Sequence, residues 1–192
     1  MAPSRNPRSA NTRATAVDIV SRWIQRGDFP ETLLETVTDH RAFVMEVAYG
    51  VARWRRYLEW AISRHAKRET PPALMAYLLV GAYQLLLMDR VEEYAAVNET
   101  VEATKRSPEA PFAGFVNAVL RSILRDRDTV RELAVREKPG IRESHPDILV
   151  NRWTRQFGDA RAIELLRWNN TRPNLCVHPF HGRATVESFI AQ

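Results

Sequence analysis

Several features that mark enzymes and membrane proteins are scarce or missing in this chain of 192 residues. Its single cysteine, Cys176, excludes an internal disulfide and a cysteine-rich metal cluster. Only seven glycines occur, none in a glycine-rich loop after a predicted strand, and the His-x-x-x-His and Gly-x-Ser-x-Gly patterns are missing. No apolar run approaches the roughly 20 residues that span a membrane. We therefore expect no catalytic, cofactor-binding or metal-binding residue in this chain, and no membrane partner.

The two ends of the chain give no sign of secretion or of metal chemistry. Residues 1–10 form a basic arm in which Arg5 and Arg8 stand among Ser, Asn and Pro, without the apolar stretch of a secretory signal. Together with the single cysteine, this predicts a cytoplasmic protein. Near the other end, Cys176 and the two histidines that follow it lack a fourth ligand, so we expect no metal there.

The basic residues are almost all arginine. The formal net charge is +5, the sequence pI is near 9.8, and only three of the 28 basic residues are lysine, which leaves 25 arginines. A planar guanidinium binds phosphate oxygens in pairs and stacks on bases, which an ammonium group does not. A GC-rich genome would give the same bias without functional meaning, so the modest positive net charge is the better indication of a nucleic-acid partner.

Apolar residues recur at helical spacing along most of the chain, and no pair of strands is visible, so we predict an all-α fold. Residues 73–88 are apolar nearly all round, which is typical of a helix at the centre of a bundle. The charged composition of residues 127–143 predicts a linker between a helical domain at 11–126 and the incomplete start of a second domain at 144–192. The predicted helices cover about residues 11–26, 31–37, 39–62, 73–88, 95–106, 112–125, 145–157 and 159–168.

Polar residues interrupt the apolar faces of two predicted helices. One helix carries Asn98 and Glu99, and the other carries Asn117 and Arg121. A buried amide or carboxylate needs partners that offset its desolvation. We interpret the four residues as a structural polar network that fixes helix register, in which Glu99 pairs with an arginine such as Arg53 or Arg121.

Two groups of arginines are candidates for contact with RNA. The candidate RNA-binding residues are Arg5, Arg8, Arg13, Arg53, Arg55 and Arg56. The first three lie in the N-terminal arm and first helix, and the others surround Trp54. Phosphate contacts position a protein on RNA, and aromatic rings stack on unpaired bases. The alternative is that these arginines are only solvated and that Trp54 belongs to the core.

Several motifs of this chain occur together in one known family of helical domains. They are Tyr94-Ala-Ala-Val-Asn-Glu-Thr-Val-Glu102, Phe115-Val-Asn-Ala-Val-Leu-Arg121, Tyr49-Gly-Val, Arg53-Trp54 and Asn169-Asn-Thr-Arg-Pro173. In these motifs the chain resembles the NusB-like helical domain. It is more closely similar to the version at the front of the bacterial ribosomal RNA cytosine-C5 methyltransferases of the RsmB (Sun/Fmu) family, and the likeness covers nearly the whole chain.

The resemblance implies a NusB-like helical bundle that contacts RNA through the arginine-rich front of its first helix, where Arg8 and Arg13 match. For a full-length protein it implies S-adenosylmethionine-dependent methylation of small-subunit ribosomal RNA, with two cysteines in a following Rossmann-like domain. Neither cysteine motif is present, because Cys176 lies outside any Pro-Cys or Thr-Cys-Ser context. At residues 176–180, Cys-Val-His-Pro-Phe also replaces an Arg-x-Asn-like strand of the family. We therefore expect no bound cofactor and no activity from this chain alone.

Three functional hypotheses remain open from the sequence. The first is the RNA-recognition part of a ribosomal RNA methyltransferase, truncated before the catalytic domain, which the family-like pairs His145-Pro146, Arg152-Trp153 and Asn169-Asn170 favour. The second is a transcription antitermination factor that binds RNA and a ribosomal protein without catalysis. The third is a helical scaffold that contacts only proteins and has no affinity for RNA.

Overall fold

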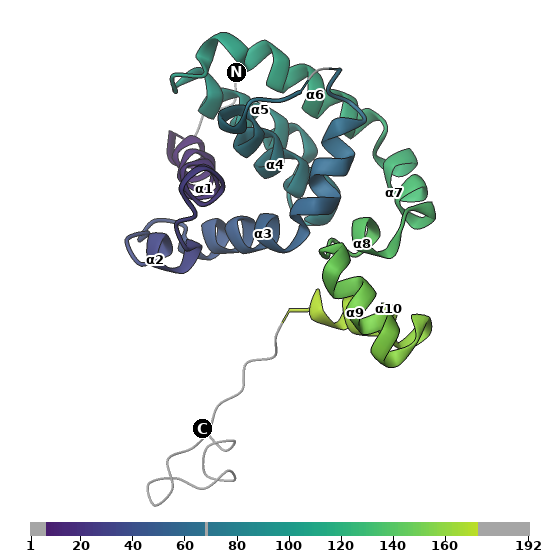
Figure 1. Cartoon of the computed structure of the whole chain (residues 1–192). Helices are drawn as coiled ribbons and strands as arrows, with labels where there is room; N and C mark the ends of the chain where they lie inside the picture. Colours follow the sequence, from purple (N-terminus) through teal and green to yellow (C-terminus); the bar gives the residue numbers. More distant parts are fainter. Residues whose placement is uncertain (1–6, 68, 173–192) are drawn as a thin grey trace, which may run out of the picture.

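The computed structural model describes residues 7–67 and 69–172, with side chains from residue 12 onward. All regular secondary structure in these ranges is helical, so the predicted all-α fold is confirmed (Figure 1). The elements are α1 (Pro7–Arg26), α2 (Pro30–Leu34), α3 (Arg41–Ser63), α4 (Pro72–Leu87), α5 (Glu93–Lys105), the 3-10 turn η1 (Ala110–Phe112), α6 (Ala113–Arg125), α7 (Arg127–Arg136), α8 (Pro139–Arg142), α9 (Asp147–Phe157) and α10 (Asp159–Asn169). No helix in the described part of the chain is both long and apolar enough to cross a membrane.

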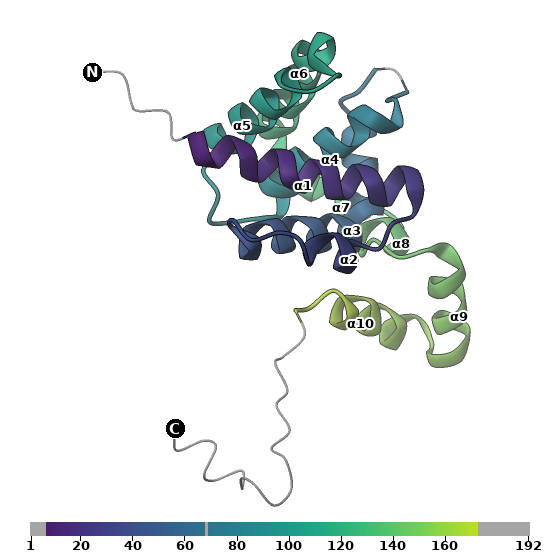
Figure 2. The ribbon, with the colours of Figure 1, turned by 90° about the vertical axis from the view of Figure 1, so that its left-hand side faces the viewer.

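Helix α4 is the centre of a bundle that contains α1 to α6. It packs against α1, α3, α5 and α6, and nearly all of its residues are buried, as its continuous apolar composition predicts. Figure 2 shows α1 lying along one face of this bundle. A Cβ atom at Gly81 would lie 2.6 Å from Cδ1 of Leu120, so the glycine allows α6 to approach the backbone of α4 closely.

Some helix boundaries differ from the sequence-based expectation. Helix α1 begins at Pro7, several residues before the predicted start at 11, because proline at the first position of a helix gives up no intrahelical hydrogen bond. His40, and not Asp39, precedes α3, and it has a left-handed backbone conformation with φ 49°.

Helix α3 is bent near Trp54, whose φ of −102° and ψ of 15° are not helical. The backbone N–H groups of Arg56 and Tyr57, at the start of the second half, donate to Oγ of Ser144 at 3.1 and 3.4 Å. A side chain that inserts into the hydrogen-bond ladder of a helix is one of the recognised causes of a kink. The predicted helix was continuous here, and the kink was missed.

The segment 127–143, predicted as a linker, is itself helical and packs on the bundle. Its helices α7 and α8 bury Val130 and Ala134, and Nε1 of Trp60 on α3 donates to Oε1 of Glu137 at 3.1 Å. Most residues of this segment are charged because only a narrow face of the amphipathic helix α7 is buried. The composition therefore resembles that of a linker. The domain boundary proposed here stays a prediction.

Helices α9 and α10 form a pair that lies beside the bundle and reaches it through α8 (Figures 1 and 2). Glu143, which follows α8, connects that helix to α10: its carboxylate accepts from Nε of Arg142 at 2.9 Å and of Arg167 at 3.2 Å. Its carbonyl oxygen accepts from Nδ2 of Asn170 at 2.8 Å and from Nδ1 of His145. The attachment is therefore made largely of hydrogen bonds and ion pairs.

Candidate nucleic-acid interface

The predicted RNA-binding arginines of the N-terminal arm are placed only in part. Arg5 lies outside the described residues. Arg8 is in the first turn of α1, but its side chain is outside the described part. Their role stays a prediction, and the structure adds only that Arg8 belongs to α1 and not to an extended arm.

Arg13 faces the inside of the bundle. Its Nε donates to Oε1 of buried Gln84 on α4 at 3.2 Å, and its guanidinium lies 4.5 Å from the ring centroid of Phe43 on α3. Burial lowers the pKa of Arg13, and the nearby charge of Glu99 on α5 partly opposes that shift. Arg13 thus connects α1 to three other helices, and much of its hydrogen-bonding and stacking capacity is used inside the protein.

Glu99 does not form the ion pair that we expected with Arg53 or Arg121. Its Oε2 atom is buried and has no hydrogen-bond partner in the described part of the chain. The charge that acts on it is that of Arg13, through space. A buried carboxylate oxygen without a hydrogen bond is costly, so the Arg13 cation is the compensation that this structure provides.

The arginines around Trp54 separate into different environments. Arg56 points toward the C-terminal helices, where Nη1 donates to the carbonyl oxygen of His145 at 2.6 Å and the guanidinium binds both carboxylate oxygens of Asp147 at 2.7 and 2.8 Å. This bidentate hydrogen bonding raises the pKa of Arg56. A Cβ atom at Gly140 would lie 2.7 Å from Nη1 of Arg56, so the glycine makes room for the guanidinium. Arg56 is therefore a structural residue.

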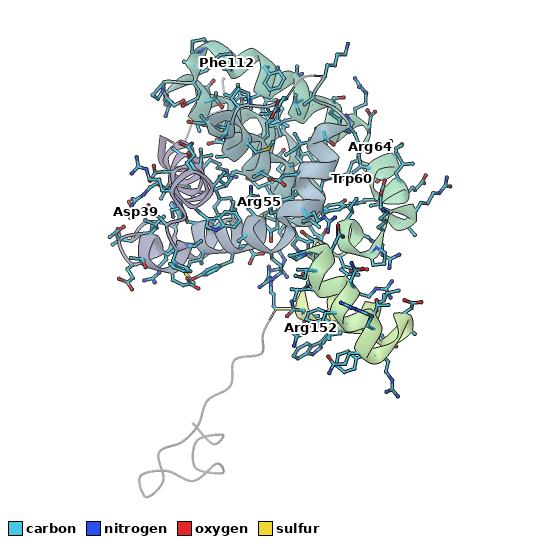
Figure 3. All side chains as sticks on the ribbon, viewed as in Figure 1. Asp39, Arg55, Trp60, Arg64, Phe112 and Arg152 are labelled. Atoms are coloured by element: carbon cyan, nitrogen blue, oxygen red, sulfur yellow. The ribbon has the colours of Figure 1, made fainter. Side chains whose placement is uncertain are left out.

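Arg55 is more accessible than Arg56. Its guanidinium lies 5.2 Å from the ring centroid of Trp23, its Nε donates to Glu59 at 2.7 Å, and its side chain is 41% exposed. Figure 3 labels Arg55 and Trp60 on α3, and Arg64 directly after the end of this helix. Half-buried Arg53 has no side-chain hydrogen bond to another described residue. Arg53 and Arg55 therefore keep capacity for an external anion.

Trp54 packs against the core, as the alternative interpretation of this cluster held. The sequence analysis missed a cation–π pair at the end of α3. The guanidinium of Arg64 lies 5.4 Å from the ring centroid of Trp60. The signal was present as an aromatic and a basic residue four positions apart on one helix.

Three members of the predicted polar network line an open pocket between α5 and α6. Asn98, Asn117 and Arg121 contribute to its wall, and Nε of Arg121 donates to Oδ1 of Asn117 at 3.1 Å. Glu99 is not part of this wall, so the structure does not bring the four predicted residues into one network. The amides are half-buried and border solvent, whereas the sequence suggested a buried position.

Within the described ranges, no group of three or more His, Cys, Asp or Glu side chains could hold a metal ion. Cys176, His178 and His181, which the sequence analysis weighed as ligands, lie outside those ranges.

Comparison with known proteins assigns the bundle to a family. The model of the NusB family matches residues 10–125, which is more than half of the chain and coincides with α1 to α6. The chain belongs to the NusB family. The resemblance to the NusB-like domain is therefore confirmed, and it rests on the bundle in which Arg13, Gln84 and Glu99 lie.

Curated relatives of this NusB-family chain extend the similarity beyond the bundle. Ribosomal RNA small subunit methyltransferase B of Pasteurella multocida is 30% identical over 93% of this chain and 41% of that protein. The proteins of the same name from Cronobacter sakazakii and Pseudomonas putida are 31% and 30% identical, over 86% and 97% of this chain and 40% and 43% of their own lengths. The chain thus spans about two fifths of the length of these relatives.

Proposed function

We propose that this chain binds RNA as the recognition part of a ribosomal RNA cytosine-C5 methyltransferase. The observation that carries the proposal is the extent of similarity. The NusB family model ends at residue 125, whereas the similarity to the methyltransferase from Pasteurella multocida runs over 187 residues. It therefore includes helices α7 to α10, which a NusB domain alone does not explain. Small-subunit ribosomal RNA as the partner, and the cytoplasm as the location, follow from the same proposal.

The polar junction between α3 and the C-terminal helices supports recognition by one rigid unit. Arg56 binds Asp147 with both carboxylate oxygens, and Nδ2 of Asn169 donates to Nε2 of His145 at 2.9 Å. Since these bonds are directional, they fix the orientation of α9 and α10 on the bundle. Arg152, which is exposed on α9, lies at the opposite end of the molecule from Phe112 (Figure 3), so basic residues extend well beyond the bundle.

The proposed RNA contacts come from Arg5, Arg8, Arg53 and Arg55. We assign structural roles to Arg13 and Arg56, because their guanidinium groups already bind Gln84 and Asp147. S-adenosylmethionine and the catalytic cysteines of the proposed methyltransferase would belong to a part of the protein other than this chain. The role of the present residues is to bind and orient the RNA by phosphate contacts and base stacking.

A transcription antitermination factor remains the second candidate, because the NusB family match alone fits it equally well. Such a factor would bind RNA and a ribosomal protein with the bundle alone, so helices α7 to α10 have no assigned role in it. The two candidates differ in the preferred RNA. The first predicts tighter binding to structured hairpins of small-subunit ribosomal RNA than to an unstructured antitermination RNA, and the second predicts the reverse.

The test is a titration of the 192-residue chain with hairpins from small-subunit ribosomal RNA over a series of salt concentrations. Because bound cations of the protein release counterions from phosphates, the affinity should fall steeply as salt rises. Arg8→Ala should weaken binding several-fold without changing the melting temperature, and Arg136→Ala, an exposed arginine at the end of α7, is the matched control. Equally weak binding to RNA and to a neutral polymer at every salt concentration would exclude both RNA-binding candidates and leave the protein scaffold.

A further inference from the structure

The pocket between α5 and α6 has the size of a binding site for a small chemical group. Its cavity volume is about 260 Å³, just below the roughly 300 to 1,000 Å³ of pockets that enclose a whole small ligand, so it suits a single flat group. Its wall comes from the first two turns of α5 and from α6 between Asn117 and Leu124. The lining residues are Glu93, Tyr94, Val97, Asn98, Asn117, Arg121 and Leu124.

The amides in this wall have hydrogen-bonding capacity that the protein does not use. The side chain of Asn98 makes no hydrogen bond to another residue in the described ranges, although it is half-buried. Asn117 uses Oδ1 to accept from Arg121 at 3.1 Å, which leaves its NH2 group as a donor toward the pocket. An amide presents a donor and an acceptor side by side, and the edges of nucleobases offer the complementary pair.

The rim and the floor of the pocket suit a flat ring. The Tyr94 side chain at the rim is 68% exposed. Because a tyrosine ring is large and mostly apolar, an exposed one offers a face on which another ring can stack. Val97 and Leu124 add apolar surface to the lining. Unpaired bases of RNA are recognised in this way, by stacking on an aromatic face and hydrogen bonding along one edge.

The charges around the pocket favour a ligand that carries phosphate. Arg121 is exposed, and only its Nε is used by Asn117, so its terminal N–H groups remain for an anion. The one carboxylate in the lining, Glu93, is bound by Arg127 of α7. The negative charge of Glu93 is thus neutralised by Arg127 and does not repel a phosphate.

We propose that this pocket binds one unpaired base of an RNA strand. The base stacks on Tyr94, its edge meets the amides of Asn98 and Asn117, and the neighbouring phosphate binds Arg121. The proposal rests on the RNA binding proposed above and adds a contact with a base to the phosphate contacts of the arginines. A side chain of a partner protein is the competing occupant, and the experiment below separates the two.

The experiment measures the affinity of the full chain for ribosomal RNA hairpins with a single-stranded loop, and for the same hairpins with one abasic position at each loop nucleotide in turn. Tyr94→Ala should weaken binding of the intact loop by about 5- to 100-fold, which corresponds to the usual energy of one base stacked on an aromatic ring. The variant and the wild type should bind alike when the abasic position is the one whose base occupies the pocket. Asn98→Ala should also weaken binding and should change which loop base is preferred.

Controls distinguish a lost contact from a damaged fold. Tyr94→Phe keeps the ring and should bind nearly as the wild type does, and Phe29→Ala, which removes a ring that is 74% exposed between α1 and α2, should have no effect. Melting temperatures of all four variants should match the wild type. Wild-type affinity of Tyr94→Ala and Asn98→Ala for every RNA would overturn the pocket proposal while leaving RNA binding intact. If the wild-type chain binds none of the RNAs, both proposals fail.

Discussion

The bundle and the C-terminal helices of this protein are held together by different forces. The bundle has one continuous apolar core that includes α4 and the inner faces of α1, α3, α5 and α6. Helix α9, by contrast, has no fully buried residue, and α10 buries only Ala162 and Leu166. The C-terminal pair is held to the bundle by hydrogen bonds from Arg56 of α3 to His145 and Asp147, and to the end of α8 by bonds of Glu143.

This difference separates stability from orientation. Burial of apolar area is the larger source of folding free energy, but it is not directional. Hydrogen bonds add little net energy each, yet they specify distance and angle. Ile148 and Trp168 remain 76% and 70% exposed on the C-terminal pair, which shows how little apolar area that pair buries. We infer that the bundle sets the stability of the protein and that the junction sets the position of α9 and α10.

The largest expected effect comes from a cavity in the bundle. Leu120 is fully buried against Gly81, and Leu120→Ala should lower the free energy of unfolding by about 2 to 5 kcal/mol. Leu166 is also fully buried, but in α10. Leu166→Ala should raise hydrogen exchange in α9 and α10 and leave the protection of α4 unchanged.

Urea unfolding and residue-resolved hydrogen exchange measure these two quantities on the same samples. A shift of the global midpoint by Leu166→Ala as large as that caused by Leu120→Ala would mean that the bundle and the C-terminal pair unfold as one unit. The comparison between the two regions would then be wrong.

A smaller effect is expected from the buried arginine of the bundle. Arg13→Ala removes the donor to Oε1 of Gln84 and a cation that interacts with Glu99, whose Oε2 is buried, so it should reduce stability by about 1 to 3 kcal/mol. Arg26→Ala, at the exposed end of the same helix, is the control and should leave the unfolding midpoint nearly unchanged. Loss of RNA affinity by Arg13→Ala at full stability would instead place this arginine at the RNA surface.

The smallest effect on global stability is expected at the junction. The hydrogen bonds from Arg56 lower the pKa of the Asp147 carboxyl below its usual value. A carboxylate whose pKa is lowered in the folded state stabilises that state at pH values above its unfolded pKa, about 4. The contribution disappears as the pH falls through the lowered folded value. Acid should therefore loosen α9 and α10 before it unfolds the bundle.

Amide protection factors of α9 and α10 between pH 6 and pH 3 measure this loosening, with the protection of α4 as the internal reference. Arg56→Gln should reduce the protection of α9 and α10 several-fold at neutral pH, and Asp147→Asn should remove the part of the acid response that this carboxylate supplies. Arg155→Gln is the control, because its Nε binds the carbonyl oxygen of Asn151 within α9. Unchanged protection in Arg56→Gln would show that the remaining contacts of Glu143 and Ser144 suffice.

Helix order, the all-α class and the central position of α4 were predictable, because each depends on a local periodic pattern. The helical nature of 127–143 had a local signal as well, since Val130 and Ala134 are spaced one turn apart. The many charged residues around Val130 and Ala134 led us to predict a linker instead of a helix. In a short amphipathic helix, two buried residues are enough to define the inner face.

The contacts of Arg13 and Arg56 with other parts of the protein were not predictable, because free and hydrogen-bonded arginines are identical in a sequence. Their environment depends on residues far along the chain, such as Gln84 and Asp147. The separation of Glu99 from the other members of the predicted polar network has a related reason. Asn98 and Glu99 are neighbours in sequence, but adjacent residues of a helix point about 100° apart and meet different surroundings.

The contact between Ser144 and α3 also sets an order of events during protein synthesis. The backbone N–H of Arg56 donates to the Ser144 hydroxyl, which is 88 residues further along the chain and is therefore synthesised later. At roughly 5 to 20 residues per second, the ribosome needs on the order of 4 to 18 seconds to deliver it. We infer that the N–H groups of Arg56 and Tyr57 leave the ribosome without this acceptor, and that the bend at Trp54 gains its Ser144 hydrogen bonds only after α8 has been translated.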